Sequence, residues 1–193
     1  VLGIDSSDSM IEEAKKSYPH LEFATVDALK ISYECEWDII FSNAVFHWIN
    51  DHNLLLQKIF RALKLNGKLI CEFGAYGNIS VIENGFNHAI QKMGMTYTSK
   101  FNFPMVSDFE SLLTKNGFKI EQIYSYDRPT PLKDGERGLF NWAIQFFQSE
   151  LAQMSAEQKD IVLSAMSNEI KSELWNGTCW VADYKRLRVI ATK

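Results

Sequence analysis

Apolar runs of strand length alternate with amphipathic helical segments along most of this 193-residue chain, and this alternation constrains its fold most. Asn-Gly pairs at 66–67 and 116–117 each follow a segment of helical spacing and precede a strand-like run. Because Asn and Gly readily take the left-handed conformation that ends helices, each pair predicts a helix-to-strand connection. Repeated connections of this kind predict a doubly wound, mostly parallel α/β sheet. The expected strands cover residues 1–4, 21–26, 37–43, 68–73, 118–124 and 180–191, and the expected helices cover residues 9–18, 51–63 and 108–115.

Two local patterns sharpen this prediction. Ser9 and Glu12 stand in the S-x-x-E arrangement of a capping box, which predicts a helix start at Ser9. The run from Trp37 to Asn43 is apolar on both faces, as expected for a buried central strand.

The segment from Gly135 to Leu174 breaks the alternation. It contains no strand-like run, and its apolar residues recur at helical spacing. We therefore expect a helical cap or lid at residues 135–176, inserted before the last strand of an α/β core made of residues 1–134 and 177–193.

The composition is that of a globular domain and argues against several classes of function. The 20 Lys and Arg residues against 24 Asp and Glu residues give a net charge of −4, and no basic block occurs, so we expect neither nucleic-acid nor membrane binding. The three cysteines are odd in number and far apart, which indicates no metal site and fits a reducing cytoplasm. No apolar run is long enough to span a membrane.

A polar residue stands at the carboxyl end of three expected strands: Asp5, Asp27 and Asn43. Ligands of open α/β sheets bind beyond the carboxyl ends of the strands. The carboxylate of Asp5 can accept hydrogen bonds from both hydroxyls of a ribose, and that of Asp27 from an exocyclic amine such as that of adenine. Each also has a structural alternative, which is helix capping for Asp5 and a solvated turn for Asp27.

Four segments, in their order and spacing, resemble class I S-adenosylmethionine-dependent methyltransferases from the second strand of that family onward: residues 1–5, 26–28, 37–43 and 63–69. The helix around Trp142 and residues 44–49, 108–113, 117–118 and 182–191 resemble the trans-aconitate methyltransferase branch. The resemblance covers nearly the whole chain. It implies a Rossmann-like sheet, S-adenosylmethionine as cofactor and a small-molecule acceptor.

The resemblance also implies roles for particular residues. Asp5 would hold the ribose, Asp27 would lie at the adenine, and the turn from Asn43 to Trp48 would line the methyl-transfer site. The expected cofactor-binding residues are Asp5, Ser6, Asp27, Ala28, Asn43 and Ala44, the expected catalytic residues are His47 and Trp48, and the expected substrate-binding residues are Trp142 and Arg186.

The sequence departs from the family pattern at its start. It opens inside a strand-like run at Val1, without Met, and lacks the first strand and its GxGxG loop. We therefore expect residues to be missing upstream, a sheet without its central strand, and strand edges that could pair in a homodimer.

A carboxylate acceptor is ionised at neutral pH and needs cationic or hydrogen-bonding anchors rather than a general base. Arg186 is one candidate anchor. His47 could act as a base toward a hydroxyl or amine, orient a carboxylate, or simply pack against Trp48. Organic-acid O-methylation is thus our leading prediction, and the competing hypotheses are a nucleotide-dependent Rossmann oxidoreductase and a non-catalytic fragment.

Overall fold

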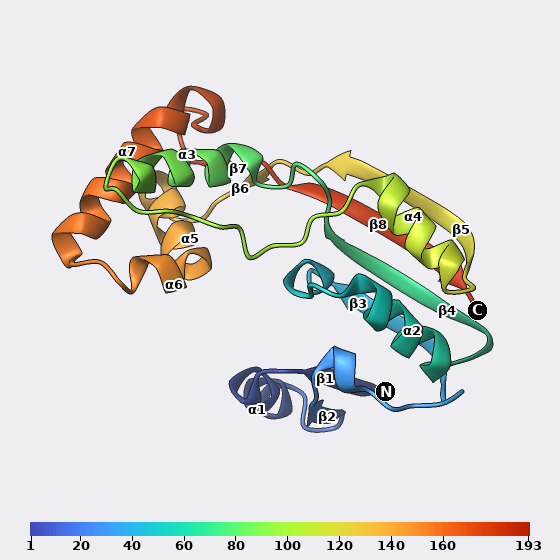
Figure 1. Cartoon of the computed structure of the whole chain (residues 1–193). Coiled ribbons are helices and arrows are strands. Elements are labelled where there is room, and N and C mark those ends of the chain that lie inside the picture. The colour runs from blue at the N-terminus through green and yellow to red at the C-terminus, as the bar shows by residue number, and fades with distance from the viewer. The chain divides into compact units, whose positions relative to one another are not determined.

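The computed structural model describes all residues, 1–193, which form two compact units (Figure 1). The first unit comprises residues 1–72, 106–124 and 188–193, and the second comprises residues 73–105 and 125–187. Three long strands contribute residues to both units.

In the first unit, strands and helices alternate as expected. Its elements are β1 (Leu2–Asp5), α1 (Asp8–Ser17), β2 (Glu22–Thr25), η1 (Ala28–Lys30), β3 (Trp37–Asn43), η2 (Phe46–Trp48), α2 (His52–Ala62) and α4 (Val106–Lys115), with parts of β4 (Leu63–Gly74), β5 (Lys119–Asp127) and β8 (Lys185–Thr192). The parallel pair β1-β2 forms one sheet, and β3 pairs parallel with β4 in a second sheet of order β3-β4-β8-β5.

The strands β1 and β3 are not hydrogen-bonded to each other, and each has a single neighbour. As a result, Ile39 and Phe41 of β3 are 57% and 71% exposed. The prediction that β3 is buried on both faces is therefore wrong for these side chains, because nothing in the chain covers that edge. The interruption lies where we expected a central strand to be lacking. Missing upstream residues and a homodimer stay predictions.

Two predicted helix boundaries need correction. Helix α1 is capped by Ser7, whose Oγ accepts a hydrogen bond from the Met10 amide, and not by Ser9, because the helix already begins at Asp8. The first Asn-Gly pair does not end a helix. Helix α2 stops at Ala62, and Asn66, at φ 63°, lies where the register of β4 against β3 shifts.

The second Asn-Gly pair behaves as predicted. Gly117 follows α4 with φ 88°, and a Cβ atom there would come within 3.1 Å of the Phe60 ring. A left-handed backbone and a close aromatic neighbour both favour glycine at this position.

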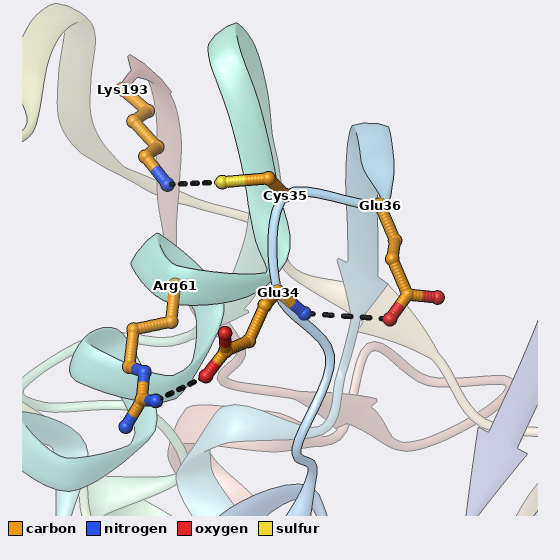
Figure 2. A network of polar contacts seen from close by, with 5 residues as sticks. All are labelled: Glu34, Cys35, Glu36, Arg61 and Lys193. Atoms are coloured by element: carbon orange, nitrogen blue, oxygen red, sulfur yellow. Dashed lines mark hydrogen bonds and ion pairs between the residues drawn. The ribbon is translucent and has the colours of Figure 1, made fainter.

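A polar network lies at the amino-terminal end of β3, opposite to the end that carries Asn43 (Figure 2). Arg61 of α2 forms an ion pair with Glu34, and the amide of Glu34 donates to Glu36 Oε1 at 3.4 Å. The Lys193 ammonium contacts Cys35 Sγ at 3.7 Å. The network joins the loop before β3 to α2 and the C-terminus.

The second unit is mainly helical. Its elements are α3 (Ser80–Gln91), β6 (Thr130–Pro131), η3 (Gly135–Arg137), α5 (Gly138–Phe146), α6 (Gln148–Leu151), α7 (Ala156–Leu174) and β7 (Val181–Ala182), with the remaining parts of β4, β5 and β8. The strand pair β6-β7 is antiparallel. No helix of the chain combines the length and apolarity needed to cross a membrane.

The helices of this unit share one core. Phe86 of α3 stacks on Phe147 with ring centroids 3.9 Å apart, and Gly85 packs against Ile170 of α7. The expected cap, residues 135–176, therefore packs with α3, a helix that the sequence did not lead us to predict. Its function as a lid stays a prediction. The single strand expected at 180–191 is wrong, because β7 ends at Ala182 and β8 begins at Lys185.

Candidate functional site

A cavity of about 860 Å³ lies in the first unit at the carboxyl ends of β1 and β3. It is lined by all six expected cofactor-binding residues, Asp5, Ser6, Asp27, Ala28, Asn43 and Ala44, and by Trp48. Cavities of about 300–1,000 Å³ are typical of sites for small ligands and cofactors. The structure thus brings together the residues that the sequence placed at three separate strand ends.

Asp5 ends β1 and is half-buried. Its Oδ1 accepts the amide hydrogen of Ser7 at 2.8 Å, which holds the carboxylate in a fixed orientation. The cap of α1 is Ser7. The capping alternative for Asp5 is therefore wrong, and Oδ2 has no hydrogen-bond partner in the chain.

Asp27 follows β2 and caps the short helix η1, with its Oδ1 accepting the amide hydrogen of Leu29 at 2.9 Å. Its Oδ2 lies 3.6 Å from Lys30 Nζ, and both side chains are substantially exposed. Asp27 thus has a structural role in the turn and also lines the cavity. The two roles are compatible, because a carboxylate can accept several hydrogen bonds.

The chain turns sharply after β3. Ala44 has φ 58°, which is unfavourable for a residue with a side chain, and its amide donates to the Glu72 carbonyl at 2.7 Å. Left-handed non-glycine residues cost about 1 kcal/mol or more and are found at functional sites. This turn directs the segment from Ala44 to Trp48 along the cavity.

The two expected catalytic residues differ in position. Trp48 is 44% exposed and lines the cavity, whereas His47 is 7% exposed and is not among the lining residues. The two rings pack together, with centroids 5.4 Å apart. This arrangement favours the packing alternative for His47, and a catalytic role for either residue stays a prediction.

His52 stabilises this turn through a hydrogen bond and an aromatic contact. Its buried Nε2–H donates to the Phe46 carbonyl at 2.9 Å, and its ring meets Phe109 edge to face at 5.4 Å. Burial lowers the pKa of His52 below its usual 6.5, against the opposing effect of the Phe46 hydrogen bond. A neutral His52 therefore fixes the helix η2. No local pattern in the sequence indicated this role.

The expected substrate-binding residues lie in the second unit, where Tyr184 joins them. The Trp142 indole Nε1–H donates to the Tyr184 hydroxyl at 2.6 Å, and the Arg186 guanidinium lies 4.6 Å from the centre of the Tyr184 ring. We did not predict Tyr184. Its position two residues before Arg186, on the same face of an extended segment, was the available signal.

No cluster of His, Cys, Asp and Glu side chains could hold a metal ion. Cys71 is buried and its burial raises the pKa of the thiol, which keeps it protonated and unreactive.

Comparison with known proteins supports one fold. Residues 1–71 match the methyltransferase domain family. The whole chain is 28% identical to an uncharacterized methyltransferase of Schizosaccharomyces pombe and covers 78% of it. A 69-residue stretch, 36% of the chain, is 41% identical to trans-aconitate 2-methyltransferase of Methylobacterium radiotolerans but covers only 26% of that enzyme. The crystal structure of YcgJ from Bacillus subtilis superimposes on the whole chain with a TM-score of 0.67, at 14% identity and over 81% of that protein.

These similarities confirm the predicted class I methyltransferase fold, a mixed α/β architecture with a mostly parallel central sheet. They also confirm the predicted enzyme class, a methyltransferase. The trans-aconitate branch, the roles of individual residues and the identity of the acceptor stay predictions.

Proposed function

We propose that this methyltransferase transfers a methyl group from S-adenosylmethionine to the carboxylate of a small organic acid. One observation carries the proposal: Asp5, Asp27 and the turn at Asn43 line a single cavity. The three strand ends therefore act as one site, which is what an elongated nucleoside ligand requires.

Different residues of the cavity suit different parts of S-adenosylmethionine. The Oδ2 atom of Asp5 has no partner in the chain and can accept from the ribose hydroxyls, while Ser7 holds Oδ1 in place. Asp27 offers a carboxylate for the adenine amine. Apolar side chains such as Ile4 and Phe41 also line the cavity and can pack against the flat face of the base.

When bound, S-adenosylmethionine supplies an electrophilic methyl group attached to a positively charged sulfur. The residues of this chain have three tasks: to hold the cofactor, to align the acceptor oxygen with the methyl carbon and to keep water out. Trp48 suits the last task, because its half-exposed indole borders the cavity.

A carboxylate is the acceptor that this chain suits best. A carboxylate oxygen is already a nucleophile at neutral pH, so no general base is needed. This fits the burial of His47 against Trp48. Arg186, which carries a guanidinium, is the candidate anchor for an anionic acceptor. The named substrate of the Methylobacterium relative, trans-aconitate, is likewise a carboxylic acid.

The proposal is tested by turnover. The protein is incubated with S-adenosylmethionine and a panel of mono-, di- and tricarboxylic acids, and release of S-adenosylhomocysteine is measured. We expect release with one or more di- or tricarboxylates and not with their neutral amides. Release with amines or alcohols alone would contradict the carboxylate assignment.

A further inference from the structure

A second, smaller cavity lies in the first unit, between the loop before β3 and helix α2. Its volume is about 70 Å³, and its walls are formed by Ile31, Ser32, Tyr33, Glu34, Lys58 and Arg61. A buried water molecule needs about 10–15 Å³, so this cavity has room for about five atoms of that size. A tetrahedral oxyanion such as a phosphate group fits such a space. None of the polar residues of this cavity lines the larger cavity at the strand ends, so the two are separate sites.

Hydrogen-bond donors without partners surround the smaller cavity. The Lys58 ammonium and the hydroxyls of Ser32 and Tyr33 form no hydrogen bond or ion pair with another group of the chain. Arg61 uses one terminal nitrogen of its guanidinium for Glu34, and its other N–H groups remain available (Figure 2). Since Lys58 and Arg61 are three positions apart on α2, they lie on one face of that helix.

The two walls of the cavity are fixed relative to each other. The amides of Cys35 and Glu36 donate to two carbonyls at the end of α2, each at 2.9 Å. The ring of Tyr33 also meets that of Trp37 edge to face, with centroids 5.5 Å apart. The donors of the loop and of the helix are therefore held in place before a ligand binds, which lowers the entropy cost of binding.

The charges of the cavity favour an anion. Two cations and one carboxylate line it, and the carboxylate of Glu34 is already paired with Arg61. A cationic ligand would meet the unpaired ammonium of Lys58. A phosphate group carries a charge of about −1.5 to −2 at pH 7 and accepts hydrogen bonds at several oxygens, which suits a guanidinium, an ammonium and two hydroxyls.

We infer that this cavity is a binding site for a phosphate group, which Lys58 and Arg61 hold together with the hydroxyls of Ser32 and Tyr33. Free phosphate and the phosphate of a monoester present the same oxygens to these donors. The inference does not depend on the proposed function, because the site shares no polar residue with the larger cavity.

The test compares Lys58→Gln with a matched control, Lys115→Gln. Both changes remove one positive charge from a helix of the first unit, and Lys115 lies on α4 outside the cavity. Titration calorimetry at constant ionic strength measures the Kd of inorganic phosphate and of glycerol 3-phosphate. Loss of a hydrogen bond between charged groups predicts at least tenfold weaker binding by Lys58→Gln, whereas Lys115→Gln should match the wild type. Because Lys58 has no partner in the chain, Lys58→Gln should unfold at the same urea concentration as the wild type.

A third variant, Glu34→Gln, should have the opposite effect. It removes the negative charge from the cavity and releases the guanidinium of Arg61, so phosphate should bind more tightly than to the wild type. Equal affinities for the two compounds would identify free phosphate as a sufficient ligand, and tighter binding of glycerol 3-phosphate would identify a monoester; both support the site.

Four results would overturn the inference: no saturable binding of either compound by the wild type, wild-type affinity in Lys58→Gln, an equal loss in Lys115→Gln, or equal or weaker binding by Glu34→Gln. The binding of S-adenosylmethionine tests the proposed function separately, since Glu34 and Lys58 do not line the larger cavity.

Discussion

The proposed cofactor-binding role of Asp5 leads to a prediction that separates its two carboxylate oxygens. Oδ1 is held by the Ser7 amide at 2.8 Å, whereas Oδ2 has no partner in the chain. In Asp5→Asn, the amide oxygen can still accept from Ser7, so the turn before α1 is kept. The atom that replaces Oδ2 becomes an NH2 group, which cannot accept from ribose hydroxyls.

The magnitude follows from the bond that is lost. A hydrogen bond to a charged group contributes about 1.5–3 kcal/mol, and each 1.4 kcal/mol corresponds to a factor of ten in Kd. We therefore expect Asp5→Asn to weaken S-adenosylmethionine binding about 10- to 100-fold in a calorimetric titration. Urea unfolding should show little change in stability.

The control is Ser7→Ala, which removes the cap of α1 and leaves the carboxylate of Asp5 intact. Loss of the cap should lower the free energy of unfolding by about 1 kcal/mol. The Kd for the cofactor should stay within about twofold of the wild-type value, which is far less than the change expected from the loss of one hydrogen bond. If Asp5→Asn binds the cofactor as tightly as the wild type, the assignment of Asp5 to the ribose is wrong.

Three further predictions concern the framework. In Gly85→Ala, the new methyl group would lie 2.5 Å from the Ile170 side chain. After allowing for the better helix propensity of alanine, we expect the free energy of unfolding in urea to fall by about 1 kcal/mol. An unfolding midpoint equal to or above that of the wild type would contradict the close α3–α7 packing. Because burial lowers the pKa of His52, the unfolded state binds the extra proton and stability falls as pH drops below 6.5. His52→Phe should show a smaller loss of unfolding free energy between pH 7.5 and 5.5, and an undiminished loss would exclude His52 as its source. Burial raises the pKa of Asp183, so the wild type should lose stability relative to Asp183→Asn as the pH rises from about 4 to 7. Asp183→Ala also loses the cap of α3, so it should be about 1–2 kcal/mol less stable than Asp183→Asn at neutral pH. Equal stability of the two variants would argue against the cap.

The sequence predicted those parts of the fold that local patterns determine. The strand over residues 37–43 has the predicted bounds, and α2 and α4 lie within two residues of theirs, because apolar spacing and capping residues act over short distances. The shared cavity at these strand ends was also predictable, since the carboxyl ends of parallel strands meet at one edge of a sheet. Asp5 and Asp27 could therefore be brought together from their positions alone.

What the sequence missed depends on contacts between distant segments. Helix α3 has no capping side chain at its own start, where Ile79 has φ 53°, and its cap comes from Asp183. No local pattern can reveal a cap that lies 102 positions away in the chain. Tyr184 was missed for a similar reason, because its partner Trp142 lies on another element.

The central claim is that the cavity bearing Asp5, Asp27 and Asn43 binds S-adenosylmethionine. One calorimetric titration of the protein with S-adenosylmethionine, S-adenosylhomocysteine and NAD tests it most directly. The account predicts saturable binding of both sulfur compounds, weakened by Asp5→Asn, and no comparable binding of NAD. Binding of NAD without either sulfur compound would contradict the account and favour an oxidoreductase, and binding of none of the three would favour a non-catalytic fragment.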